Sequence, residues 1–330
     1  MIPLHGHDAA VAAFRESLDS GRLHHAWLIS GPTGVGKALF AQKAALRVLA
    51  AGQGELTASG LDVPDAHPAA RLFAAGSHPD FMQLERLVKE TSSTGELARS
   101  ISVDQVRSLQ RLFSTTASFS PWRVVVIDAI DDLERNAANA LLKNLEEPPP
   151  HSLFLLVSHA PERLLPTIRS RCRQLRLSPL GDDAMASALR SALPDAGGPE
   201  IADLVAAGHG SPGRAIAFRG LDIAALDQAM LALARAGDPT NAKRAALAQT
   251  LSLKSAQPRY EAFLQRAPTL IAAEAKERRG SALAFALTAY EKAQALASSA
   301  RGLSLEPESV VFELGGLLAS LAPTPEPARR

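Results

Sequence analysis

Short apolar runs alternate with longer stretches of helical character in the first half of the chain. Residues 26–30 (AWLIS) form an apolar run that stops at Gly31, and residues 37–50 consist largely of helix-forming residues. Residues 124–127 and 153–157 are rich in Val, Ile and Leu, as are strands buried on both faces of a parallel sheet. Together with a further strand expected at 80–84, the pattern predicts βαβ units.

Start and stop signals bound two more helices in this half. Ser102 followed by Gln105 fits a capping box, and the helix that it opens is expected to end near Pro121. Three consecutive prolines from Pro148 onwards stop a second predicted helix, residues 133–147. Both helices are long enough to cover a face of the sheet.

Residues 52–76 interrupt this alternation. The segment is rich in Gly, Ser, Pro and Asp and has no hydrophobic periodicity. We therefore expect a long surface insertion without a helix or strand of its own.

Beyond Pro179 the strand pattern disappears, and Ala- and Leu-rich segments are separated by Gly, Pro and short polar joints. This predicts two helical domains, with a break at 208–213 and a boundary near Gly220. The expected division is therefore 1–178, 179–220 and 221–330.

One long helix and the start of another are expected in the last domain. Pro307 fits the first turn of a helix. Four residues recur at helical spacing and are expected to form the apolar face of the preceding helix: Leu283, Leu287, Tyr290 and Leu296.

Composition narrows the class of protein. Hydrophobic residues make up 46% of the 330 positions and aromatic residues only 5%, which favours a helical core of Ala, Leu and Val. Lys and Arg number 35 against 34 Asp and Glu, so bulk charge does not predict nucleic-acid binding. A single cysteine, Cys172, excludes an internal disulfide. With no signal peptide or membrane span in the pattern, we expect a cytoplasmic protein.

Residues 31–37 (GPTGVGK) match a phosphate-binding loop placed between a strand and a helix. Its residues Gly31, Thr33, Gly34, Gly36 and Lys37 are candidates for holding a phosphate, because backbone N–H groups curl around it and the lysine adds a positive charge. The next position is Ala38, where Ser or Thr would give magnesium a hydroxyl ligand.

Asp128, at the end of a predicted buried strand, is the candidate acidic residue of the same site. In ATP-hydrolysing proteins of this architecture a glutamate follows it, but here the next residue is Ala129. Asp131 and Glu134 fit a helix-capping pair better than a replacement base. Both the magnesium hydroxyl and the general base are therefore missing.

Several longer stretches resemble one family, the AAA+ clamp-loader subunits of bacterial DNA polymerase III. They are LHHAWLISGPTGVGK, HPDFMQLE and, within residues 123–177, ANALLKNLEEPP, LLVSHAPERLLPTIRSRC and QLRL. The resemblance implies a P-loop AAA+ domain with a parallel five-stranded sheet flanked by helices, a small helical lid domain and an all-α collar domain.

The same resemblance suggests roles for three residues. Arg171, in the Ser-Arg-Cys triplet, corresponds to an arginine that reaches the ATP site of the adjacent subunit, whereas charge spacing alone would place it on a solvated basic face with Arg169, Arg173 and Arg176. Ser158 resembles a sensor near the γ-phosphate, and Arg214 resembles the sensor arginine of the lid; each is equally compatible with a structural role. Cys172 is expected to be a buried packing residue.

Family members usually carry four zinc-binding cysteines in the insertion, but residues 52–76 contain none. His67 and His78 remain nearby, and two histidines without thiolates are more often ordinary surface residues. We expect no bound metal.

The resemblance therefore implies a stator-like subunit that hydrolyses no ATP itself and requires no cofactor, with at most weak ATP or ADP binding. The implied partners are the gamma and tau ATPase subunits, the delta subunit, the sliding clamp and, through the complex, primed DNA. Two alternatives stay open: an active ATPase subunit like gamma or tau, and a scaffold whose loop never binds nucleotide.

Overall fold

The computed structural model describes residues 2–52, 56, 60–89, 95, 97–114, 116–303 and 305–323, without the side chains of 301–303. The chain forms two compact units, Met1–Ala217 and Phe218–Arg330. Within the described residues, no helix has both the length and the apolar character that crossing a membrane requires.

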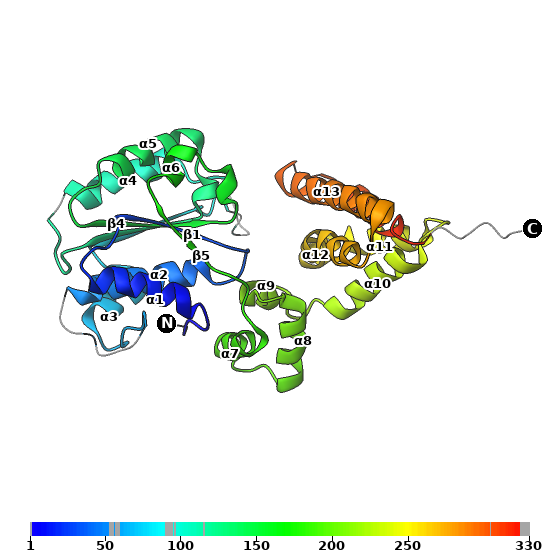
Figure 1. The fold of residues 1–330 in the computed structure, drawn as a ribbon, viewed down its shortest axis with the longest axis horizontal. Helices are drawn as coiled ribbons and strands as arrows, with labels where there is room; N and C mark the ends of the chain where they lie inside the picture. The colour runs from blue at the N-terminus through cyan, green and yellow to red at the C-terminus, as the bar shows by residue number, and fades with distance from the viewer. Residues whose placement is uncertain are drawn as a thin grey trace, which may run out of the picture. The chain divides into compact units, whose positions relative to one another are not determined.

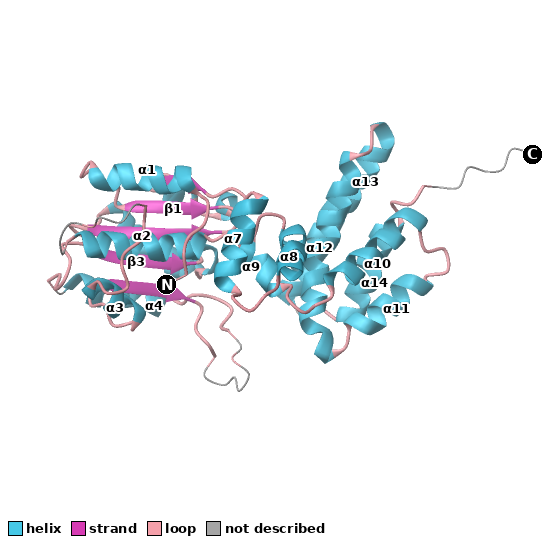
Figure 2. Ribbon diagram, turned by 90° about the horizontal axis from the view of Figure 1, so that it is seen from below, coloured by secondary structure: helices cyan, strands magenta, loops and turns pink. Residues whose placement is uncertain are grey.

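A five-stranded parallel sheet forms the centre of the first unit, as expected from the resemblance (Figures 1 and 2). The strand order is β2-β3-β4-β1-β5, and every neighbouring pair is parallel. The strands are β1 (Ala26–Ser30), β2 (Phe81–Glu85), β3 (Arg123–Asp128), β4 (Ser152–Ser158) and β5 (Arg173–Arg176). All five therefore end at one edge of the sheet, which becomes the site of the loop described below.

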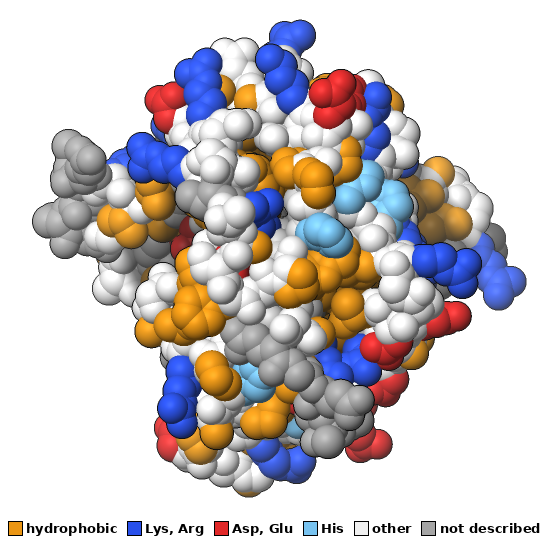
Figure 3. Space-filling view, turned by 90° about the vertical axis from the view of Figure 1, so that its left-hand side faces the viewer, with side chains coloured by type: hydrophobic (Ala, Val, Ile, Leu, Met, Phe, Trp, Pro, Cys, Tyr) orange, Lys and Arg blue, Asp and Glu red, His pale blue; other side chains and the backbone are white. Residues whose placement is uncertain are grey.

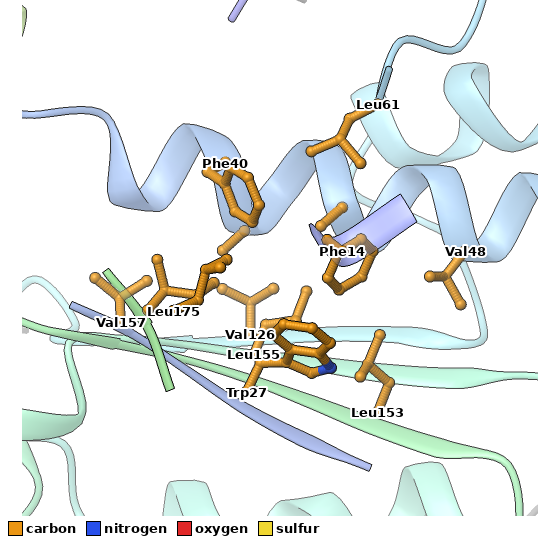
Figure 4. Close-up of a cluster of buried hydrophobic side chains, with 14 of the residues drawn as sticks. Phe14, Trp27, Phe40, Val48, Leu61, Val126, Leu153, Leu155, Val157 and Leu175 are labelled. Atoms are coloured by element: carbon orange, nitrogen blue, oxygen red, sulfur yellow. The ribbon is translucent and has the colours of Figure 1, made fainter. Parts of the chain in front are cut away.

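Alternate residues of each strand point to opposite faces, and helices cover both (Figure 1). One face is covered by α1 (Asp8–Asp19) and α2 (Lys37–Ala51), and the other by α4 (Val103–Ser114) and α5 (Arg135–Glu146). Figure 4 shows Trp27 of β1 lying between the sheet and Phe14 of α1, with the ring centroids 5.1 Å apart. Leu28, the next residue of the strand, is buried in the opposite layer. This two-sided burial explains the continuous apolar runs.

The capping box at the start of α4 is confirmed. Gln105 N donates to Ser102 Oγ at 3.3 Å, and Ser102 N donates to the side-chain oxygen of Gln105 at 3.0 Å. The helix ends at Ser114, before the predicted end near Pro121, because three backbone amides of the following turn, at 118–120, donate instead to the Asp80 carboxylate. Short elements in this layer are α6 (Pro166–Arg169) and the 3₁₀ turns Ile130–Asp132 and Pro161–Arg163.

The expectation that residues 52–76 contain no element is wrong. Helix α3 (Pro68–Ala74) begins after His67, whose Nδ1 accepts a 3.2 Å hydrogen bond from Ala69 N. The helix is stable because Ala69 and Ala70 pack against Leu46 and Ala50 of α2. This tertiary burial compensates for a segment too short to show helical periodicity.

Three helices complete the first unit and share a small apolar cluster. They are α7 (Asp182–Ala192), α8 (Gly198–Gly208) and α9 (Pro212–Ala217). Their cluster consists of buried Met185, Leu189, Ile201, Leu204 and Ala215. Figure 2 shows the strand arrows pointing toward these helices, so this layer faces the carboxyl edge of the sheet.

The second unit is entirely helical in its described residues. Its elements are α10 (Ile223–Ala236), α11 (Ala242–Leu251), the 3₁₀ turn Lys254–Ala256, α12 (Gln257–Lys276), α13 (Gly280–Leu303) and α14 (Pro307–Ala319). Helix α14 packs against α10, α11, α12 and α13. Pro307 occupies its first turn, as predicted.

The predicted apolar face of α13 is not the one that is buried. Leu287 is 47% exposed, whereas the buried positions are alanines: Ala286, Ala289, Ala293, Ala297 and Ala300. Small side chains let the backbones of neighbouring helices approach closely, so the alanine stripe rather than the leucines faces the core.

Figure 3 shows one face of the molecule on which hydrophobic and histidine side chains occupy the middle and charged side chains of both signs lie around them. A continuous basic patch is not visible on this face. This agrees with the balanced charge of the sequence.

Candidate nucleotide site

The phosphate loop joins the end of β1 to the start of α2. Its three glycines all have positive φ angles, 147° at Gly31, 80° at Gly34 and 109° at Gly36, which residues with a side chain rarely adopt. A Cβ atom at Gly31 would lie 2.3 Å from the carbonyl oxygen of Leu177. The sequence therefore forms the loop that its glycines predict, with Thr33 exposed at its tip.

Lys37 is folded over its own loop. Its Nζ donates to the carbonyl oxygens of Gly31 at 2.7 Å and Pro32 at 2.8 Å, and the residue is only 3% exposed. Burial lowers the pKa of Lys37 to about 8, and the carboxylates of Asp128 and Asp131 oppose that shift. The ammonium that would neutralise a phosphate is thus held by the loop carbonyls.

Helix α9 lies directly against the loop. Gly213 N donates a 2.8 Å hydrogen bond to Gly34 O, and a Cβ atom on Gly34 would lie 2.6 Å from Arg214 N. Arg214, the candidate sensor arginine, therefore meets the loop through its backbone, while its side chain is half-buried. His7 also contacts the loop, donating from Nε2 to Val35 O at 2.9 Å.

A cavity of about 370 Å³ lies between the loop, the N-terminal segment and helices α7 and α9. Its charged and histidine lining residues are His5, Lys37, Asp128 and His159. The remainder is largely apolar, and its side chains include Ile2, Leu4, Leu180, Ala188, Ala192 and Ile216. A largely apolar cleft with a few charged groups in its lining suits a ligand with a flat ring and a phosphate.

Asp128 ends β3 as predicted and lines the cavity. Burial raises the pKa of Asp128, and the neighbouring His159 opposes that rise. His159 was not identified from the sequence, since a lone histidine after a strand carries no signal. Burial lowers its pKa, which favours a neutral ring near pH 7. The next residue after Asp128, Ala129, is buried and offers no acid or base.

The predicted Asp131–Glu134 capping pair is wrong. Asp131 accepts hydrogen bonds from Ser158 Oγ at 3.0 Å, His159 N at 2.7 Å and Ala160 N at 3.1 Å. Glu134 precedes α5 without a side-chain cap and accepts from Ser100 Oγ at 2.9 Å. Asp131 therefore fixes the end of β4, because tertiary contacts that a local pattern cannot show satisfy its carboxylate.

Ser158, the candidate sensor, is fully buried at the end of β4. Its hydroxyl donates a hydrogen bond to the Asp131 carboxylate. A ligand at Ser158 would have to use the remaining acceptor capacity of this oxygen or break that bond.

Arg171 lies at the opposite edge of the sheet from the phosphate loop. Arg171 lies between α6 and the start of β5, whereas Gly31 follows the end of the neighbouring strand β1. The two strands are parallel, with Trp27 paired with Arg173 and Ser30 with Arg176. The separation is therefore close to the length of a strand, roughly 13 Å over four residues. Arg171 does not face the phosphate loop of its own chain.

The guanidinium of Arg171 is anchored but accessible. Its Nη2 forms a 2.8 Å ion pair with Glu146 Oε1, and its Nη1 donates to Thr167 O at 2.9 Å. The side chain remains 34% exposed. The adjacent Cys172 is buried, and burial raises the pKa of its thiol to about 12, which supports a packing role.

The other arginines near Arg171 are not one uniform basic face. Arg173 stacks over the ring of Trp27 at 4.7 Å and donates to Ser17 Oγ at 3.3 Å. Arg169 and Arg176 are exposed. Arg173 is therefore partly structural, which makes it a poor neutral comparison for Arg171.

No cluster of three or more His, Cys, Asp or Glu side chains suited to a metal is present among the described residues. The expectation that His67 and His78 are surface residues is wrong for His78, which is 4% exposed and accepts a 3.2 Å hydrogen bond from Asp80 N. Residues 53–55 and 57–59 of the insertion lie outside the described part of the chain.

Sequence comparison matches residues 6–181 to a family described as DNA polymerase III, delta subunit. The chain is 39% identical over 188 residues to DNA polymerase III subunit delta' of Pseudomonas aeruginosa, covering 57% of this chain and 53% of that protein. It is 34% identical over 178 residues to subunit tau of Escherichia coli, covering 53% of this chain and 25% of that protein. The chain thus spans about half the length of the delta' relative.

Among solved structures, a gamma subunit-related protein of Thermotoga maritima aligns with 94% of this chain and 99% of its own, at 12% identity and a TM-score of 0.45.

Proposed function

The chain belongs to the family described as DNA polymerase III, delta subunit, and from that premise we propose that it is a non-hydrolysing subunit of a clamp loader. In this proposal it joins gamma or tau ATPase subunits and a delta subunit in a ring that places the sliding clamp on primed DNA. It supplies Arg171 to the ATP site of the adjacent subunit.

One observation carries the proposal: Arg171 is exposed at the amino edge of the sheet, whereas its own phosphate loop lies at the carboxyl edge. This placement keeps Arg171 away from its own phosphate loop, which supports a role at a site on another chain. Its planar fork of donors matches the oxygens of a transferring phosphoryl group.

The chain's own site supports the non-hydrolysing role. Ala38 offers no hydroxyl to magnesium, and Ala129 offers no carboxylate to polarise water. The ammonium of Lys37 is bonded to loop carbonyls, and the contact between Gly213 and Gly34 brings α9 against the loop. We propose that ATP or ADP binds weakly at most and that no cofactor is required.

An active ATPase subunit is the second candidate, because tau relatives match at 34% identity and both Lys37 and Asp128 line the cavity. The two candidates differ in turnover by the isolated chain. Steady ATP hydrolysis that Lys37→Ala abolishes would establish the second candidate. A third candidate, a scaffold whose loop binds no nucleotide, would show no measurable affinity for ATP.

The decisive test is reconstitution with the gamma or tau, delta and clamp proteins encoded in the same genome. Adding the chain should restore clamp loading on primed DNA to a mixture that lacks it, without any ATP turnover by the chain alone. A mixture equally active without the chain would contradict the proposal. We further propose that the second unit, Phe218–Arg330, joins the subunits. Deleting it should abolish assembly as seen by gel filtration.

A further inference from the structure

The side chain of Arg171 is held from two directions, although it stands at an exposed edge. Glu146 Oε1 lies 2.8 Å from its Nη2, and the carbonyl of Thr167 accepts from its Nη1 at 2.9 Å. The hydrogen bond to Thr167 uses one of the five N–H donors of the guanidinium, and the ion pair with Glu146 lies on the side of Nη2. Donors at the exposed side of the group remain available to a ligand.

The position of Glu146 is itself fixed by the sheet. Glu146 is the last residue of α5, and the preceding Leu145 is buried in the apolar layer. His25, just before β1, donates from Nε2 to Leu145 O at 3.1 Å. The carboxylate is thus carried by a helix end that is tied to the residue just before β1.

Glu147 provides a comparison within the same chain. It follows Glu146 directly and is likewise exposed, but the ion pair with Arg171 comes from Glu146. Two neighbouring glutamates therefore carry the same charge, but only Glu146 contacts the guanidinium.

We propose that Glu146 is a positioning residue for Arg171. An unrestrained arginine side chain samples many rotamers, and a group that acts in a transition state is more effective when its geometry is fixed beforehand. Glu146 selects the rotamer in which the free donors of Arg171 are presented to the neighbouring subunit. This inference rests on the trans-acting role proposed for Arg171.

The alternative is that the pair only stabilises the fold. A half-exposed ion pair contributes little to folding, so its loss should leave the assembled complex intact. A positioning role predicts instead a change in the turnover of the complex at unchanged affinity for ATP.

The test uses the complete reconstituted loader with clamp and primed DNA. Glu146→Ala is expected to cause at least half of the loss in kcat that Arg171→Ala causes, with the KM for ATP unchanged. Glu146→Gln should cause a smaller loss, since its amide oxygen keeps a polar partner of the same size beside the guanidinium. Glu147→Ala, the matched control, should retain full kcat.

A double variant separates positioning from an independent effect. Glu146→Ala combined with Arg171→Ala should lose no more activity than Arg171→Ala alone, because without the arginine there is nothing to position. A further loss in the double variant, a gain of activity in Glu146→Ala, or identical kcat in Glu146→Ala and Glu147→Ala would each overturn the inference.

Failure of the underlying function gives a different result. If Arg171→Ala leaves an intact complex fully active, the trans-acting role itself is wrong. Gel filtration of each reconstituted complex shows whether it assembled. Should Glu146→Ala fail to assemble, the nearly isosteric Glu146→Gln decides the question on the same kcat comparison with Glu147→Gln.

Discussion

Gly213 N donates a 2.8 Å hydrogen bond to Gly34 O, which joins the first turn of α9 to the tip of the phosphate loop. The approach is close because both residues lack side chains: a Cβ on Gly213 would lie 3.0 Å from the Gly34 Cα. A loop shaped for a phosphate is thereby used as a packing surface between the sheet and helices α7–α9.

Gly34→Ala should destabilise the first unit by about 2–4 kcal/mol, because the new methyl group meets Arg214 N at 2.6 Å and the φ angle of 80° is strained for alanine. Urea denaturation measures the change. Gly198→Ala is the control, since nothing lies within 4 Å of its added Cβ, and it should leave stability unchanged or slightly raised. Equal stability of both variants would show that α9 is not held by this contact.

The buried ammonium of Lys37 should give the protein a specific pH dependence. Its folded pKa of about 8 lies below the ordinary 10.5, so between these values the unfolded chain binds a proton that the folded chain does not. The contribution of Lys37 to the free energy of unfolding should therefore rise by about 2 kcal/mol from about pH 7.5 to about pH 9.5. It should be constant below that window.

The measurement compares wild type with Lys37→Met by urea unfolding across this range, so that other titrating groups cancel. The difference in free energy of unfolding between the two proteins should grow in favour of wild type as pH rises. A difference independent of pH would mean that the ammonium is better solvated than its burial indicates.

Local patterns in the sequence predicted the loop and four of the five strands, whereas the fifth strand, β5, was expected only from the family resemblance. Strand β3 is buried on both faces and is therefore an unbroken apolar run in the sequence. The loop glycines indicate a turn that requires positive φ angles. Helix α3 was missed because its stability comes from packing on α2, and the buried face of α13 was misassigned because alanine carries little hydrophobic signal.

The site was less predictable than the fold for the same reason. Asp131, His159 and Glu146 gain their roles from contacts with residues distant in sequence, such as the 3.0 Å bond from Ser158 to Asp131. Local spacing favoured a helix cap for Asp131, and nothing in the sequence distinguished Glu146 from Glu147.

Asp131→Ala should cost about 2–4 kcal/mol of stability, because it leaves the fully buried Ser158 hydroxyl and two backbone amides without their acceptor. Glu134→Ala removes one exposed hydrogen bond and should change stability by less than about 0.5 kcal/mol. Urea unfolding of the two variants tests the assignment. The original capping hypothesis would be revived if Glu134→Ala proved the more damaging change.

The protein should contain no stoichiometric zinc. In place of a metal module, Lys43 Nζ pairs with Asp62 Oδ1 at 2.6 Å, and Arg47 donates to Asp62 O at 3.3 Å, which tie the described part of the insertion to α2. Elemental analysis should find no zinc, and EDTA should leave Tm unchanged. One zinc per chain, with a lower Tm after chelation, would contradict this prediction.

Arg171→Ala should strongly reduce ATP hydrolysis at the adjacent site of the assembled loader. Arginines that act this way in phosphoryl transfer contribute roughly a thousandfold or more in rate. Arg171→Lys should not restore full activity, since a point charge cannot reproduce two parallel hydrogen bonds from one planar group. The measurement is ATP hydrolysis by the reconstituted complex, stimulated by clamp and primed DNA.

The control variant decides whether a loss of ATP hydrolysis comes from one arginine acting at the adjacent ATP site or from a general basic surface. Arg173→Ala is unsuitable, because it removes the stacking on Trp27 as well as a charge. Arg169→Ala removes the same charge from an exposed position two residues away, so it should cost little. If both variants lower the rate equally in complexes of normal size on gel filtration, the effect is general electrostatics. If Arg171 acts on the adjacent site, only Arg171→Ala should lower the rate of ATP hydrolysis.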